Sequence, residues 1–143
     1  MNYKLMKFDN QKLFEEVRPR VLVVEDSLLM ANRIKKVIEK LGYEVVGHAK
    51  DGIEAIDEFK VLMPDIVTMD ITMPVMNGIQ AYEVILKHYP CAKIIIISSC
   101  NQKKIVLDAL FKGVKHFVVK PFTDEKIREV IENVLIQDSM SIN

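Results

Sequence analysis

Residues 65–70 read DIVTMD, a short run rich in apolar residues that ends in a carboxylate. Two further runs have a similar character, VLVV at 21–24 and KIIII at 93–97. Short runs of Val and Ile without polar alternation are typical of strands buried on both faces, and sheets built from such strands are parallel. The sequence therefore predicts a parallel sheet that contains the 65–70 stretch.

Strand-like and helix-like segments alternate along the chain. The strands are predicted at residues 20–24, 43–47, 65–69, 93–97 and 114–119. Each is followed by a segment whose apolar residues recur at helical spacing. Asp51 and Asn77 stand at the N-cap position of two of these segments. Five strand–helix repeats predict a doubly wound α/β fold, with a five-stranded parallel sheet and helices on both faces.

Composition indicates one globular domain and excludes several partners. The chain has 143 residues, 50% of them hydrophobic, and equal numbers of acidic and basic side chains. A net charge of zero argues against direct binding of nucleic acid. No apolar run approaches the roughly 20 residues that cross a bilayer, and the charged first 20 residues do not resemble a signal peptide. Cys91 and Cys100 show no metal or disulfide spacing, so we expect a cytoplasmic protein without a membrane partner.

Polar residues follow four of the predicted strands. They are Glu25 and Asp26 after the first, Asp70 after the third, Ser98 after the fourth and Lys120 after the fifth. The carboxyl ends of parallel strands meet at one edge of the sheet, where the binding crevice of such folds lies. Each residue alone could be a helix cap or a solvated charge, but together they favour a functional site. Crowded carboxylates suit Mg²⁺, and the lysine could pair with a carboxylate or with a phosphoryl group on it.

At these residues the chain resembles the receiver domain of two-component response regulators, the CheY-like family. The matching segments are VLVVEDS (21–27), DIVTMDITMPVMNG (65–78), IIIISS (94–99) and VVKPF (118–122). The resemblance covers about residues 20–136 and implies the flavodoxin-like (βα)5 version of the predicted fold. We expect an amino-terminal extension at 1–19, the receiver domain at 20–137 and a carboxyl-terminal tail at 138–143.

The resemblance implies a phosphoacceptor and a metal site. Asp70 would accept a phosphoryl group from a histidine of a sensor histidine kinase. Asp26 would bind Mg²⁺ directly and Glu25 through water, together with Asp70 and the backbone carbonyl of Thr72. Mn²⁺ could take the place of Mg²⁺.

The resemblance also implies a response to phosphorylation. Lys120 would pair with the phosphoryl group, and Ser98 would hydrogen-bond to it and move towards it. Phe117 occupies the position of an aromatic switch residue, where the family more often has Tyr. Because Phe has no hydroxyl group, a switch here must work by packing, and an ordinary core Phe is an equal alternative. The Lys120–Pro121 peptide bond is expected to be cis.

Two positions that modulate dephosphorylation in the family carry Thr72 and Cys100. Neither side chain offers a carboxylate or carboxamide that could orient an attacking water. The sequence therefore predicts slow self-dephosphorylation. The side chain of Thr72 also disfavours a phosphohydrolase, which needs an acid at that position.

The function predicted is that of a phosphorylation-activated response regulator, not an enzyme beyond its own phosphorylation and dephosphorylation. Only seven residues follow Ile136, so we expect output through a protein partner: a motor switch, a phosphatase or a phosphotransfer protein. Likeness to chemotaxis regulators around TMDITMP (68–74) and FVVKP (117–121) favours chemotaxis. The alternatives are an intermediate carrier of a phosphorelay and a receiver used only for protein contacts. A monomer or a phosphorylation-dependent dimer is expected.

Two further groups of residues carry weaker signals. The region around the fourth predicted helix is basic, with Lys103, Lys104, Lys112 and Lys115. It is either a solvated face or a docking surface for an acidic partner. The histidines show no metal-ligand spacing: His48, His88 and His116.

Overall fold

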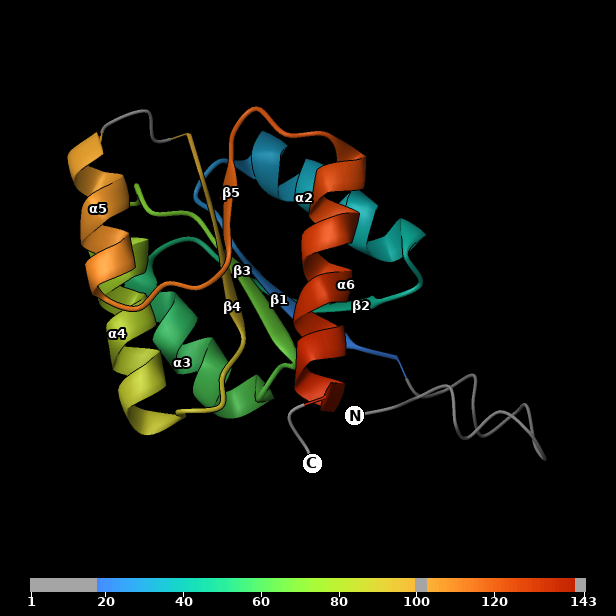
Figure 1. The fold of residues 1–143 in the computed structure, drawn as a ribbon, viewed down its shortest axis with the longest axis horizontal. Helices are drawn as coiled ribbons and strands as arrows, with labels where there is room; N and C mark the ends of the chain where they lie inside the picture. Colours follow the sequence, from blue (N-terminus) through green and yellow to red (C-terminus); the bar gives the residue numbers. More distant parts are fainter. Residues whose placement is uncertain (1–17, 100–102, 141–143) are drawn as a thin grey trace.

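The computed structural model describes residues 18–99 and 103–140, so most of the predicted amino-terminal extension and Cys100 lie outside the described residues. Strands and helices alternate along the described part of the chain (Figure 1). In chain order the elements are β1 (Arg20–Val24), α2 (Leu28–Lys40), β2 (Glu44–Ala49), α3 (Gly52–Leu62), β3 (Ile66–Met69), α4 (Gly78–His88), β4 (Ile94–Ser98), α5 (Lys103–Phe111), β5 (Phe117–Val119) and α6 (Asp124–Met140).

The five strands form one parallel sheet in the order β2-β1-β3-β4-β5. Helices α2 and α6 cover one face, and α3, α4 and α5 cover the other (Figure 1). The predicted doubly wound α/β fold is thus confirmed. The sheet order reverses between β1 and β3, and the crevice of such a sheet lies outside the carboxyl ends of these two strands.

Local sequence signals explain where the helices begin. The side chain of Asp51 accepts a hydrogen bond from the backbone N–H of Glu54, which caps α3. Asn77 and Gln80 exchange two such bonds in a capping box that begins α4. Each cap satisfies backbone donors that a helix start leaves without partners. Both predicted caps are confirmed.

The two edge strands and the last helix differ from the predicted bounds. β2 covers Glu44–Ala49, where the sequence suggested 43–47. β5 covers only Phe117–Val119, where the sequence suggested 114–119. Val114 is buried without joining the sheet, and the pairing of β5 with β4 begins only at Phe117, opposite Ile96. α6 extends to Met140, so residues 138–140 of the predicted tail are helical. The boundary of the domain itself stays a prediction.

Candidate functional site

Three carboxylates meet at the carboxyl ends of the two central strands. Glu25 and Asp26 follow β1, and Asp70 follows β3. The backbone N–H of Asp70 donates to Val24 O at 3.0 Å, which keeps the two strand ends level. One oxygen of each carboxylate lies within 4.8 Å of the others. Glu25 and Asp70 are buried, whereas Asp26 is exposed, so the cluster opens to solvent on the side of Asp26.

Lys120 closes the buried side of the cluster. Its Nζ lies 2.7 Å from Glu25 Oε1 and 3.6 Å from Asp70 Oδ1. The lysine follows β5, and its backbone N–H donates to Ser98 O at 2.9 Å. The Lys120–Pro121 peptide bond is cis. One ammonium therefore faces two buried carboxylates, and it pairs more closely with Glu25 than with Asp70.

The charge balance of the cluster changes the acidity of Asp70. Burial and, after it, repulsion by Glu25 raise the pKa of its carboxyl, which reaches about 6. The ammonium of Lys120 and the backbone N–H of Ile71, 2.9 Å from Oδ1, offset only part of it. The site thus holds more negative than positive charge. A hard divalent cation such as Mg²⁺ would supply the missing positive charge, so the donor set fits it.

The loop after Asp70 is fixed by a close approach of two backbone segments. A Cβ atom on Gly78 would lie 2.0 Å from the backbone oxygen of Asp70, so no other residue fits without moving the chain. The N–H of Gly78 donates to Ile71 O at 2.8 Å. Thr72 lies exposed in this loop, two residues past Asp70. Helix α4 therefore begins directly against Asp70.

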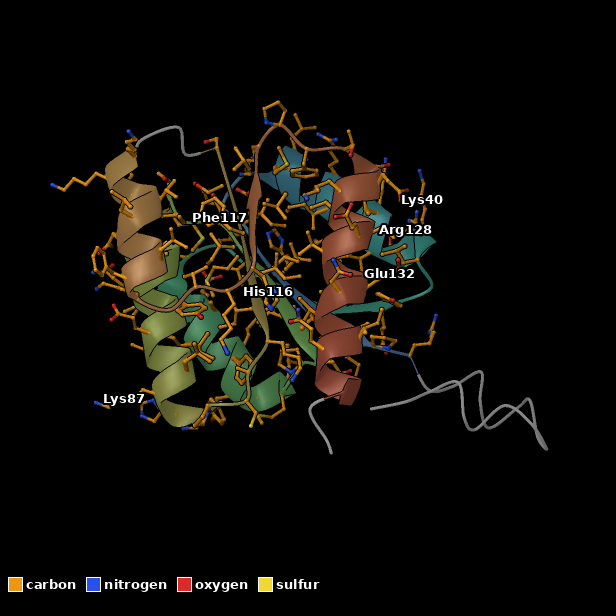
Figure 2. The ribbon with its side chains drawn as sticks, in the orientation of Figure 1. Lys40, Lys87, His116, Phe117, Arg128 and Glu132 are labelled. Atoms are coloured by element: carbon orange, nitrogen blue, oxygen red, sulfur yellow. The ribbon has the colours of Figure 1, made fainter. Side chains whose placement is uncertain are left out.

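Ser98 and Phe117 lie on the β4–β5 side of the site. Ser98 is buried at the end of β4 and pairs in register with Val119. Phe117 (Figure 2) is half-buried and packs against the core under α3, α4 and α5, as Ile105 of α5 also does. The carboxylates, the lysine and Ser98 thus share one edge of the sheet. Phe117 lies two residues before Val119 in β5 and pairs with Ile96 of β4.

Comparison with known proteins identifies the family. The family model of the response regulator receiver domain matches residues 21–132. The chain belongs to this family. A chemotaxis protein CheY of Thermotoga maritima is 49% identical over 115 residues, which are 80% of this chain and 96% of that protein. The protein CcdB of Bacillus subtilis is 46% identical over 116 residues, 81% of this chain and 97% of CcdB.

Solved structures agree with this assignment. The CheX–CheY–BeF3–Mg complex from Borrelia burgdorferi matches with a TM-score of 0.80 at 33% identity, covering 88% of this chain and 94% of that one. The response regulator domain of Thermotoga maritima CheB matches with a TM-score of 0.73 at 35% identity, covering 89% of this chain and 99% of that one. The protein is thus a receiver domain of the CheY type, consistent with two-component signalling and chemotaxis. No helix in residues 18–99 and 103–140 is long and apolar enough to cross a membrane.

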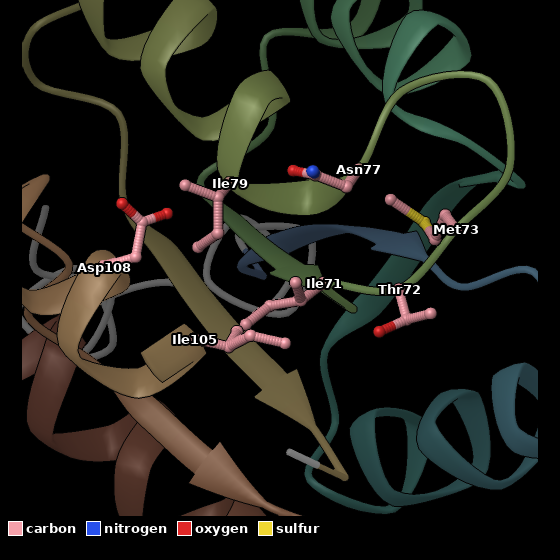
Figure 3. Close-up of a pocket in the computed structure, with 7 residues that line it drawn as sticks. All are labelled: Ile71, Thr72, Met73, Asn77, Ile79, Ile105 and Asp108. Atoms are coloured by element: carbon pink, nitrogen blue, oxygen red, sulfur yellow. The ribbon is translucent and has the colours of Figure 1, made fainter. Parts of the chain in front are cut away.

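A cavity of about 250 Å³ lies between the loop after Asp70 and helix α5 (Figure 3). It is lined by Ile71, Thr72, Met73, Asn77, Ile79, Ile105 and Asp108. Its middle is apolar and its rim carries the polar side chains of Thr72, Asn77 and Asp108. The loop after Asp70 and α5 are therefore incompletely packed against each other.

Sequence reasoning missed two residues of the site. His48 has no metal-ligand spacing in the sequence, yet its Nε2 lies 2.8 Å from the backbone oxygen of Glu25. Lys35 approaches the other ring nitrogen of His48, with 3.3 Å between Nζ and Nδ1. The sequence alone carries no signal for this contact, because it depends on the register of β1 against β2, where Val23 pairs with His48.

Proposed function

We propose that this receiver domain is a phosphorylation-activated response regulator. It accepts a phosphoryl group on Asp70 from the phosphohistidine of a sensor histidine kinase in a Mg²⁺-dependent reaction. It then signals through protein contacts, in a chemotaxis pathway. The observation that carries the proposal is the arrangement of three carboxylates whose ligand atoms lie within 4.8 Å, with the ammonium of Lys120 on their buried side.

The transfer requires one bond to form and one to break. A carboxylate oxygen of Asp70 attacks the phosphorus atom and forms an acyl phosphate. The phosphorus–nitrogen bond of the phosphohistidine breaks, and its electron pair returns to the imidazole, which takes up a proton. Both reactants are negative, so the residues of the site contribute mainly by position and charge.

The metal would be held by the carboxylates of Asp26 and Asp70, by Glu25 through water, and by the backbone carbonyl of Thr72. When bound, Mg²⁺ neutralises charge on the phosphoryl oxygens. The raised pKa of Asp70 supports this assignment, because burial and the negative charge of Glu25 oppose its ionisation and a bound cation would favour the ionised form. Mn²⁺, which also takes oxygen ligands in octahedral geometry, would serve in its place.

Lys120 and Ser98 would respond to the new phosphoryl group. Lys120 contacts Glu25 at 2.7 Å in the unmodified domain, and its Nζ is already 3.6 Å from Asp70 Oδ1. A phosphoryl group on that carboxylate brings its oxygens within reach of the ammonium. The hydroxyl of Ser98, at the end of the neighbouring β4, can donate to another oxygen. Such charge-assisted hydrogen bonds exist in one state only, and they supply the energy of the switch.

Phe117 would transmit the change to the surface around α5. Its half-buried ring packs in the same core as Ile105 of α5, so a shift of the ring alters the support of that helix. The outer side of α5 and β5 exposes large apolar side chains: Leu107 by 51%, Leu110 by 57%, Phe111 by 89% and Val119 by 52%. Four lysines accompany them: Lys103, Lys104, Lys112 and Lys115. We therefore prefer the docking surface over the solvated face.

The expected output partner is a protein with an apolar and acidic binding segment. A motor switch protein, a phosphatase or a phosphotransfer protein would fit this description. The CheY in the structure from Borrelia burgdorferi is in a complex with CheX, and this precedent supports an output through protein contacts. We expect the domain to act in the cytoplasm as a monomer or as a phosphorylation-dependent dimer.

Intact-protein mass spectrometry after incubation with acetyl phosphate and Mg²⁺ tests the proposal. Wild type is expected to gain one phosphoryl group, which EDTA prevents. The Asp70→Asn variant should gain none, whereas Asp57→Asn, which changes an exposed aspartate of α3, should gain one as wild type does. Folded wild type that gains no phosphoryl group would instead support a receiver used only for contacts.

The same sample tests the predicted slow loss of the phosphoryl group. The side chain of Thr72 cannot orient a water for attack, so we expect the modified protein to persist for minutes after acetyl phosphate is removed. Thr72→Gln introduces a carboxamide at this exposed position and should shorten the lifetime. A wild-type lifetime of seconds at neutral pH would contradict this expectation.

A further inference from the structure

A contact outside the predicted ligand set holds the loop that carries Glu25 and Asp26. The ring of His48 lies on β2, with Nε2 2.8 Å from the backbone oxygen of Glu25. On its other side, Nδ1 lies 3.3 Å from Nζ of Lys35 on α2. The three residues form a continuous chain of polar contacts from α2, across β2, to the end of β1.

The partners at both ends of the ring select the same tautomer. A lysine ammonium has three donors and no acceptor, so Nδ1 facing Lys35 must accept. A backbone carbonyl only accepts, so Nε2 facing Glu25 must carry the proton. The neutral Nε2–H form of His48 satisfies both contacts at once. The ring is half-buried, which further limits the orientations that it can take.

The carbonyl that His48 holds belongs to the peptide between Glu25 and Asp26. The N–H of Glu25 donates to the backbone oxygen of Ala49, the next residue of β2, at 2.9 Å. Two consecutive residues of β2 thus fix both backbone polar groups of Glu25. Its side chain is fixed separately, by Lys120 at Oε1 and by the N–H of Ser27 at Oε2. Asp26 is exposed, and the orientation of the peptide between Glu25 and Asp26 determines the direction in which the side chain of Asp26 leaves the backbone.

We propose that His48 and Lys35 are positioning residues for the divalent-cation site. They orient the Glu25–Asp26 peptide so that the carboxylate of Asp26 meets those of Glu25 and Asp70. The inference rests on the proposed function, because it concerns the affinity of that site for Mg²⁺. Contacts behind metal ligands typically change metal affinity by about 10–100-fold. Since His48 acts through a backbone carbonyl, we expect an effect of roughly 3–10-fold.

Isothermal titration of the unphosphorylated full chain with Mg²⁺ tests the role of His48. His48→Phe keeps a ring but removes the donor, and its Kd should rise about 3–10-fold. His48→Gln returns an N–H near the place of Nε2 and should restore the wild-type Kd within about twofold. His88→Phe is the matched control, because His88 Nδ1 makes the same kind of contact with Val84 O at 3.0 Å. Its neighbour Lys87 lies at the opposite end of the molecule from the site (Figure 2).

The outcomes separate this inference from the proposed function. Wild type that binds no Mg²⁺ would overturn both. Wild type that binds Mg²⁺ while His48→Phe binds it equally well would overturn only the role of His48. Unfolding midpoints measured without Mg²⁺ identify a general structural effect. If His48→Gln fails to restore the affinity while its midpoint equals that of wild type, the donor is not the cause and the inference is wrong.

Nitrogen-15 spectra of the histidine rings provide a test that needs no change at His48. At mildly alkaline pH the wild-type ring is expected in the Nε2–H form, and an Nδ1–H form would overturn the proposal. Lys35→Met removes the donor to Nδ1 and should move the resonance of that nitrogen. Lys36→Met, at an exposed neighbouring position of α2, should leave it in place. No movement in Lys35→Met would exclude Lys35 from the chain of contacts.

Discussion

The centre of the sheet and its β5 side are held in very different ways. At the centre, Glu25 has contacts at both backbone polar groups and at both carboxylate oxygens. On the β5 side, α5 buries only Ala109 among its described residues, and the strand beside it has three residues. A cavity lies between α5 and the loop after Asp70. The carboxylate cluster is thus fixed by many contacts, whereas the region proposed for output has few contacts that oppose a shift of α5.

The largest expected effect comes from breaking the fixed centre at Gly78. In Gly78→Ala the new Cβ would lie 2.0 Å from the backbone oxygen of Asp70, which cannot move without displacing β3. We expect a loss of roughly 4 kcal/mol or more of unfolding free energy, measured by urea denaturation. Gly47→Ala is the control, because its Cβ would meet the flexible end of Leu62 and cost much less. Equal losses in the two variants would contradict the argument.

Removing Lys120 should have the next largest effect. Lys120→Met leaves the carboxylate of Glu25, whose side chain is only 2% exposed, without its cation. Truncating one partner of a buried pair costs about 3 kcal/mol, and we expect that loss in urea denaturation at neutral pH. A second change, Glu25→Gln, should recover part of it. Lys112→Met breaks the exposed pair with Glu83 and should produce no measurable change.

Asp70→Asn should stabilise the fold while it abolishes phosphorylation. The folded-state pKa of Asp70 is about 6, above the ordinary value of 3.8 for this side chain, so the folded state holds the proton more tightly. The free energy of unfolding is therefore expected to fall as pH rises from about 4 to about 6. Above pH 6 the full cost of ionising Asp70 in the folded state is present. The variant removes this cost and should gain about 2 kcal/mol at neutral pH.

The pH dependence provides the check on that assignment. The gain in Asp70→Asn should vanish near pH 4, where wild type is protonated at this position. Mg²⁺ should stabilise wild type more than the variant, because it binds the ionised carboxylate. The unfolding free energy of Asp57→Asn should equal that of wild type at every pH. A gain that does not depend on pH would mean that ionisation of Asp70 is not its source.

The central strands and the edge of the sheet at which the polar residues gather were predictable from the sequence, whereas the bounds of β5 were not. The apolar runs VLVV, DIVTM and KIIII predicted the central strands, because strands buried on both faces typically have that composition. The parallel topology then brought the polar residues that follow these strands to one edge. The predicted β5 was too long because apolar residues before a short edge strand can enter the core without pairing, as Val114 does.

Individual contacts of the site could not be predicted in the same way. The sequence left open which carboxylate Lys120 approaches, and the structure places it nearest to Glu25. The contact of His48 with the Glu25 carbonyl depends on the strand register and on one rotamer, and no local pattern encodes either. Sequence periodicity thus predicts which residues reach the edge of the sheet, whereas their pairing follows from packing in three dimensions.

A smaller effect is expected at Val75, in the loop between Asp70 and α4. Val75 has φ of 68° and is 83% exposed, so a β-branched residue adopts a left-handed conformation without burial in return. Val75→Asn should stabilise the fold by about 1 kcal/mol in urea denaturation, because Asn tolerates this conformation. Val61→Asn is the control, at an 81% exposed position within α3 where the backbone is helical. A similar gain in both variants would rule out backbone strain as the cause.

The smallest effect on the domain itself is expected on the β5 side, at Phe111. Its ring is 89% exposed at the end of α5, so Phe111→Ser removes little that the fold depends on. The unfolding free energy should change by less than about 0.5 kcal/mol, and the rate of phosphorylation by acetyl phosphate should equal that of wild type. Phe59→Ser, at a side chain that is 3% exposed, should by contrast be strongly destabilising. A large loss in Phe111→Ser would show that this exposed surface supports the fold, and the contrast between a fixed centre and a loosely held β5 side would fail.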